Sequence, residues 1–201
     1  LPISVAVVRH QGVYTWGDGA GGRLGRGVDQ RGRGRPLKLP VVSGGEVSDH
    51  GAGFERIREV SCGGQYTVAV NYGDGAAYAW GDASGGCHGA LGMASPSKGI
   101  VAGVSLPTKV SAGFPVGTRV SRVSCGAFHA AAVTAAGDLF CWGEGAFHAL
   151  GHDGDKSTCQ HPRRVRGLWD AGRRVSNVSC GVYHTACVAI DRTTTGCAGR
   201  G

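Results

Sequence analysis

The stretch VSCGAFHAAAVTAAGDLFCWGEGAFHALG, residues 123–151, decides how the chain folds, because its main features occur three times in the sequence. It contains a Cys-Gly corner between two short β-prone runs at residues 120–124 and 130–134. A turn at residues 136–138 then leads to a third run, 139–142, and to a Gly-rich loop that ends in Leu-Gly. Short strands separated by tight turns are typical of an all-β fold.

Three phrases recur along the chain in a fixed order: Trp-Gly with a later Leu-Gly, then Pro-x-x-aliphatic, then Val-Ser-Cys-Gly. Fifteen residues separate Val110 from Cys125, and fifteen separate Val165 from Cys180. Longer spacings are confined to loops, where a repeated structural unit tolerates insertions. The Trp, Cys and Gly positions that define the repeat are Trp16, Trp80, Trp142, Cys62, Cys125, Cys180, Gly63, Gly126 and Gly181.

Each repeat supplies three clear strands and a fourth around its proline, since an outer strand tolerates a residue without a backbone N–H. Four short antiparallel strands that recur every ~50–60 residues predict the blades of a β-propeller. The predicted fold is all-β, an incomplete β-propeller of four-stranded antiparallel blades. The approximate units are residues 1–70, 71–133 and 134–190, followed by a degenerate tail at 191–201.

Trp-Gly-x-Gly…Leu-Gly, Pro-x-x-Val and Val-Ser-Cys-Gly-x-x-His together resemble the repeat of the regulator-of-chromosome-condensation family across nearly the whole chain. The resemblance implies a seven-bladed propeller, of which about three blades are present here. It also implies one activity, because the founding member of the family exchanges guanine nucleotide on the small GTPase Ran at chromatin. The residues of that activity do not map onto this sequence, and most relatives that share the repeat are not exchange factors.

The composition narrows the class of protein. The 38 glycines among 201 residues follow no three-residue period, and 41% of the residues are hydrophobic, so neither collagen nor a disordered linker fits. The formal net charge of +7 favours an acidic partner such as nucleic acid, chromatin or an acidic protein face. The alternative is that the charge serves solubility and marks no specific partner.

The cysteines and the hydropathy pattern indicate the cellular compartment in which the protein is expected. None of the eight cysteines forms a C-x-x-C pair, and three of them occupy one repeated core position. Reduced thiols in an intracellular protein, cytoplasmic or nuclear, are therefore expected. No run approaches the ~18 apolar residues that would span a membrane.

No catalytic, cofactor-binding or metal site is predicted. GDGAGG at residues 17–22 spells a dinucleotide fingerprint, but no helix pattern follows it to bind a phosphate. His129 and His184 share a repeat position with Tyr66, an exchange that suits packing better than catalysis. A group in the third unit's loops matches no zinc-ligand spacing: His148, His152, Asp153, Cys159 and His161.

The connecting loops of the first and third units are rich in cationic residues, and arginine is suited to bidentate contacts with carboxylate or phosphate. These residues are the candidate partner-binding set: Arg23, Arg26, Arg31, Arg33, Arg35, Lys38, Arg163, Arg164 and Arg166. The predicted function is a non-catalytic scaffold whose basic loops contact an acidic protein partner. Two alternatives stay open: nucleotide exchange on a Ran-like GTPase, and a propeller domain of a larger protein such as a ubiquitin ligase or a kinase.

Overall fold

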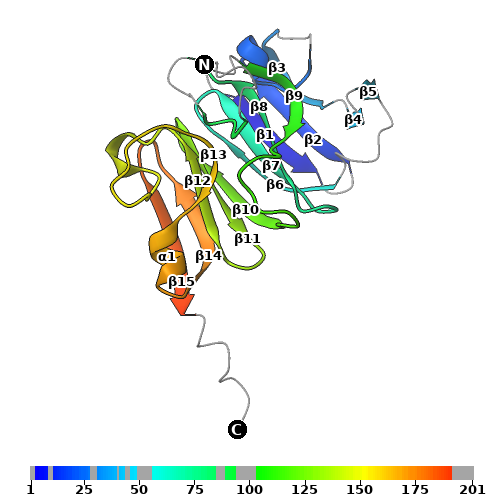
Figure 1. The fold of residues 1–201 in the computed structure, drawn as a ribbon. Coiled ribbons are helices and arrows are strands. Elements are labelled where there is room, and N and C mark those ends of the chain that lie inside the picture. The colour runs from blue at the N-terminus through cyan, green and yellow to red at the C-terminus, as the bar shows by residue number, and fades with distance from the viewer. Residues whose placement is uncertain are drawn as a thin grey trace.

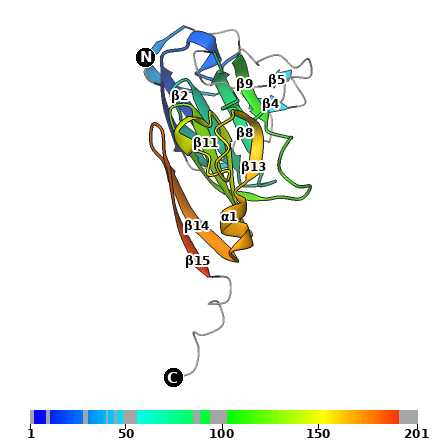
Figure 2. The same cartoon turned by 60° about the vertical axis from the view of Figure 1, so that its left-hand side comes forward.

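The fold is a row of antiparallel sheets arranged like successive propeller blades (Figure 1). The computed structural model describes residues 3–8, 11–27, 31–39, 41–43, 46–48, 56–84, 89–93 and 103–191. We number the main sheets as blades 1 to 4 in chain order. The view in Figure 2, turned by 60°, shows β14 and β15 at one end of the row and β2 at the other.

Blades 2 and 3 each have four strands in sequential order, as the repeat predicted. The strands of blade 2 are β6 (Ile57–Cys62), β7 (Tyr66–Asn71), β8 (Ala77–Asp82) and β9 (Gly103–Lys109). The strands of blade 3 are β10 (Val120–Cys125), β11 (His129–Thr134), β12 (Leu139–Gly143) and β13 (Cys159–Arg164). Pro107 and Pro162 lie on the outer strands β9 and β13, where a missing N–H leaves no ladder bond unmade.

Blades 1 and 4 are partial within the described residues. Blade 1 consists of β1 (Ile3–Val8), β2 (Gly12–Gly17) and β3 (Arg33–Lys38), which correspond to the second, third and fourth strands of a blade. Blade 4 consists of β14 (Arg173–Cys180) and β15 (Thr185–Asp191), which correspond to the first and second. The predicted all-β partial propeller is thus confirmed, and the predicted tail beyond Asp191 lies outside the described residues.

Two connections between blades contain elements that the sequence did not predict. A hairpin of β4 (Val41–Ser43) and β5 (Glu46–Ser48) lies between blades 1 and 2. A single helix, α1 (Arg166–Asp170), follows β13 and precedes β14. Among the described residues no helix has the length and apolar character needed to cross a bilayer.

The hydrophobic core lies between the blades. One cluster joins Val68 and Tyr66 of blade 2 to Phe140 and Trp142 of blade 3, and further clusters fill the junctions on either side. Alternate residues of β11 face opposite junctions, so every residue of this strand is buried. Burial on both faces explains the continuous small apolar run HAAAVT in place of a polar–apolar alternation.

Candidate interaction surface

Two of the three repeated tryptophans, Trp80 and Trp142, are buried between neighbouring blades, where they are not accessible to a partner. Trp16, Trp80 and Trp142 occupy the same register on the third strand of blades 1, 2 and 3. Trp142 donates a hydrogen bond from Nε1 to the carbonyl of Ala90, in the loop of the preceding repeat, at 2.9 Å. Trp80 and Trp142 are fully buried, whereas Trp16, at the flank of blade 1, is half-buried.

The Val-Ser-Cys-Gly phrase also links consecutive blades. The backbone N–H of Cys125 donates to Oγ of Ser61 at 2.9 Å, and that of Cys180 donates to Oγ of Ser124 at 2.9 Å. Each serine therefore binds the first strand of the next blade. Sequence reasoning singled out the cysteine and glycine of this phrase and missed the serine, although its recurrence was a usable signal.

The residue three places after the Cys-Gly glycine reaches across to the following blade. The Tyr66 hydroxyl donates to the carbonyl oxygens of Gly126, at 3.1 Å, and His129. Nε2 of His129 lies 2.9 Å from the Thr185 hydroxyl of blade 4. His184 holds the equivalent position in blade 4 and is exposed. The buried side chains of Tyr66 and His129 thus join neighbouring blades and have a structural role.

Burial of His129 makes stability depend on pH. Desolvation lowers the pKa of His129, and of the buried His152, below the ordinary value of about 6.5. The unfolded chain then binds protons more readily than the folded chain. The stability that depends on neutral His129 and His152 is therefore fully present above pH ~6.5 and is lost as the pH falls through the folded-state pKa. We expect the free energy of unfolding to fall between pH 7 and pH 5, and less steeply in H129Q. Urea titrations at both pH values would measure this, with H148Q, at an exposed histidine, as the control. Equal pH dependence in H129Q and the parent chain would contradict it.

Two of the predicted partner-binding arginines are used inside the fold. Nη1 of Arg23 lies 2.5 Å from Oδ2 of Asp18, and its Nη2 lies 3.3 Å from Oδ2 of Asp82 on blade 2. Burial raises the pKa of Asp82, but hydrogen bonds from Ser84 and the charge of Arg23 bring it below its usual value overall. Arg26 donates to the carbonyl oxygens of Thr15 and Leu37. These two guanidinium groups link β2 to β3 and blade 1 to blade 2.

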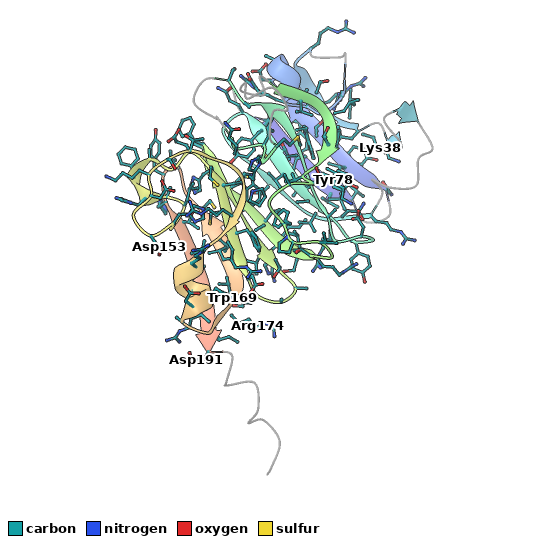
Figure 3. All side chains as sticks on the ribbon, in the orientation of Figure 1. Lys38, Tyr78, Asp153, Trp169, Arg174 and Asp191 are labelled. Carbon is teal, nitrogen blue, oxygen red and sulfur yellow. The ribbon has the colours of Figure 1, made fainter. Side chains whose placement is uncertain are left out.

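The other predicted cations lie on or beside the outer strands of two blades. Arg31, Arg35 and Lys38 are exposed in or just before β3, and the side chain of Arg33 lies outside the described residues. Arg163 and Arg164 lie on β13, and Arg166 begins α1. The outer strand of blade 2, β9, lies between the two groups, and Lys38 and Trp169 are correspondingly far apart in Figure 3.

The outer strands also repeat a cation opposite an aromatic residue. The register pairs Lys38 with Tyr14 in blade 1, Lys109 with Tyr78 in blade 2, and Arg164 with Phe140 in blade 3. The cation stands two residues after the proline in every case. The rim therefore carries one such cation in each of blades 1, 2 and 3, and Arg31, Arg35, Arg163 and Arg166 lie on the same rim.

The histidines and cysteines of the third unit form no metal centre. Nε2 of the buried His152 lies 3.2 Å from the carbonyl oxygen of Cys141, and Sγ of Cys159 donates to the carbonyl of His161. His148 and Asp153 are exposed in loops. Across the described part of the chain, no three His, Cys, Asp or Glu side chains are grouped so that they could bind a metal ion. The cysteines in that part are free thiols: Cys62, Cys125, Cys141, Cys159, Cys180 and Cys187.

The chain is similar in sequence to known proteins over most of its length. The chain is 30% identical to the E3 ubiquitin-protein ligase HERC2 of Homo sapiens over 189 residues, 94% of this chain and 3% of that protein. It is 35% identical to the Ultraviolet-B receptor UVR8 of Arabidopsis thaliana over 177 residues, 88% of this chain and 34% of the receptor. The chain thus spans about a third or less of these relatives.

Solved structures show the same fold. Prp20p of Saccharomyces cerevisiae, described with its binding to Gsp1p and histones, superposes with a TM-score of 0.75 at 20% identity. That superposition covers 94% of this chain and 42% of Prp20p. Human WBSCR16 gives a TM-score of 0.72 at 26% identity over 94% of this chain and 43% of its own.

The repeat pattern of one family matches three successive segments, residues 11–70, 74–133 and 136–188. Each segment runs from the third strand of one blade to the second strand of the next. The tryptophan, the proline and the Ser-Cys-Gly corner of each segment therefore come from two neighbouring blades and join them. The chain belongs to the regulator of chromosome condensation (RCC1) repeat family.

Proposed function

We propose that the chain is a non-catalytic interaction scaffold whose basic outer rim contacts an acidic partner. The observation that carries this proposal is that some of its arginines make contacts within the fold while others have exposed side chains at the rim. The side chains of Arg23 and Arg26 are largely buried in contacts within the fold, whereas Arg35 and Arg166 have exposed side chains on or beside the outer strands, as does Arg31. Exposed cations spread along one rim attract an acidic surface and favour its association.

The chemistry of the remaining side chains supports a scaffold. The side chains of five repeat positions make hydrogen bonds at blade junctions: Trp142, Cys125, Ser61, Tyr66 and His129. The thiols of Cys125 and Cys141 are deeply buried, and desolvation raises their pKa, which keeps them protonated and poorly nucleophilic. Cations on variable loops of a rigid propeller are the groups best placed to bind another macromolecule.

The proposal predicts that charge on β3 contributes to binding. In R31A/R35A we expect the affinity of the chain for a fluorescein-labelled acidic peptide to fall several-fold, with the loss smaller at high salt because screening weakens the attraction in both proteins. Fluorescence anisotropy across a sodium chloride series measures this. The matched control is R58A/R122A, which removes the same charge from exposed positions on the inner strands β6 and β10. Equal losses in both double variants would show that net charge alone acts and would overturn the rim assignment.

Two further measurements separate the alternatives. Binding of duplex DNA with a steep, linear dependence of log affinity on log salt would point to nucleic acid as the partner, because counterion release produces that slope. Release of a labelled guanine nucleotide from a Ran-type GTPase would test exchange, the alternative that the resemblance to the founding member of the family implies. The scaffold proposal expects no acceleration of that release by the chain.

A further inference from the structure

A cavity of about 600 Å³ lies at the outer rim of blade 3. Four segments form it: β12, β13, α1 and the connection that precedes β10, which contributes Gly113 and Pro115. Phe140 of β12 and Trp169 of α1 supply aromatic surface. Figure 3 shows Trp169 on α1, beside this rim. We call this feature the rim cavity.

Basic side chains line much of the rim cavity. His161, Arg163 and Arg164 of β13 and Arg166 of α1 line it, against one carboxylate, that of Asp170. Arg163 already has a partner, since its Nη1 lies 2.8 Å from Oδ2 of Asp155. Arg166 is exposed and makes no ion pair within the described residues.

Arg164 is held in place by two aromatic rings and by an ion pair with Asp138. Its Cζ lies 4.2 Å from the centroid of the Trp169 ring and 5.5 Å from that of Phe140, so the guanidinium is fixed by cation–π contacts. The nearest carboxylate oxygen, Oδ2 of Asp138, is 3.6 Å from Nη2, beyond hydrogen-bond distance. Nε of Arg164 is buried without a hydrogen-bond partner among the described residues, and the side chain is 32% exposed. The exposed edge of this ordered guanidinium is suited to donate to a carboxylate.

The surroundings of Arg164 indicate which ligand fits. Asp155, Asp138 and Asp170 lie around the three arginines, so the cavity presents individual guanidinium groups and no continuous positive track. Such a site suits one or two carboxylates better than a continuous row of phosphates. The indole of Trp169, 38% exposed, provides apolar surface next to Arg164. A carboxylate with a neighbouring apolar side chain is what an acidic peptide segment of a protein presents.

We propose that the rim cavity binds an acidic peptide segment of a protein partner. A Glu or Asp carboxylate of the partner bonds to Arg164 and Arg166, and an adjacent apolar side chain packs on Trp169. This inference rests on the proposed scaffold function and narrows it to one site on blade 3.

The test uses the full 201-residue chain and two fluorescein-labelled peptides, one alternating Glu with Leu and one alternating Gln with Leu. We expect the Glu peptide to bind and R164Q/R166Q to weaken it by about tenfold or more, as for loss of charged hydrogen bonds. The control is K109Q, because Lys109 holds the register position of Arg164 in the preceding blade. K109Q removes one charge and is compared with R166Q, which also removes one. We expect K109Q to change the affinity by less than about twofold. R166Q alone, at an exposed position, keeps the test valid if the double variant does not fold.

Each result of this test either supports the proposed site or contradicts it. Wild-type binding of the Glu peptide that is unchanged in R164Q/R166Q and in R166Q overturns the rim cavity and leaves the scaffold function standing. Equal weakening by K109Q also overturns the cavity, because it shows a diffuse charge effect. Binding of the Gln peptide with the same affinity rules out carboxylate recognition. Failure of the wild-type chain to bind the Glu peptide, or preferential binding of duplex DNA, overturns the acidic-protein proposal itself.

Discussion

W142A is expected to lower the free energy of unfolding by about 3–5 kcal/mol, a large part of the 5–15 kcal/mol typical of a domain. Trp142 is fully buried between blades 2 and 3 and donates a hydrogen bond to the carbonyl of Ala90. Truncation removes the aromatic contacts, opens a cavity and leaves that carbonyl without its donor. Urea unfolding followed by far-ultraviolet circular dichroism measures the change without relying on tryptophan emission.

W16A is the matched control for W142A. Trp16 has the same register on its strand but is half-buried, since no described loop of a preceding repeat packs on it. We expect W16A to cost clearly less than W142A, because less apolar surface loses its contacts. Equal costs at the two positions would mean that the tryptophans stabilise their own blades and not the junctions between blades.

G143A is expected to destabilise the chain by about 3 kcal/mol or more, one of the larger effects of a single methyl group. Gly143 has φ of +102°, and a Cβ there would lie 2.6 Å from the carbonyl oxygen of Phe128 and 2.7 Å from Cα of His129. Both contacts are with backbone, so no side chain can rotate away. The substitution must therefore move β11 or β12 in addition to straining the left-handed conformation.

G117A separates the two contributions in G143A. Gly117 has φ of +80°, and a Cβ at this position would meet nothing within 4 Å. We expect G117A to cost only the conformational penalty, about 1–2 kcal/mol. Chemical unfolding of both variants gives the difference. If G117A destabilised the chain as much as G143A, close packing of the Trp-Gly glycine would not be the reason for its presence.

The arginines show where sequence reasoning about the site reached its limit. Arg23 and Arg31 look alike in the sequence, as basic residues in one Gly-rich loop. Arg23 proves to be paired with Asp82, which is 59 residues away and on the next blade, whereas Arg31 is exposed. A charge pattern along the chain gives no information about such a partner. The rim cavity was missed for the same reason, since its lining comes from separate segments.

The sequence by itself determined the repeat, the strands and the outer place of the prolines, because turns, alternation and the missing N–H of proline act over a few residues. Only the tertiary structure decided how strands are grouped into blades. Sequence unit 71–133 contains β8 to β11, yet β8 pairs with β7 of the preceding unit and β11 pairs with β12 of the following one. The short turns after β7 and β11 favour those hairpins, so each unit spans two blades. Two hydrogen bonds then fix the junction between blades 2 and 3: the Cys125 N–H donates to Ser61, and the Tyr66 hydroxyl donates to the carbonyl of Gly126. These hydrogen bonds form only once the neighbouring blade is in place.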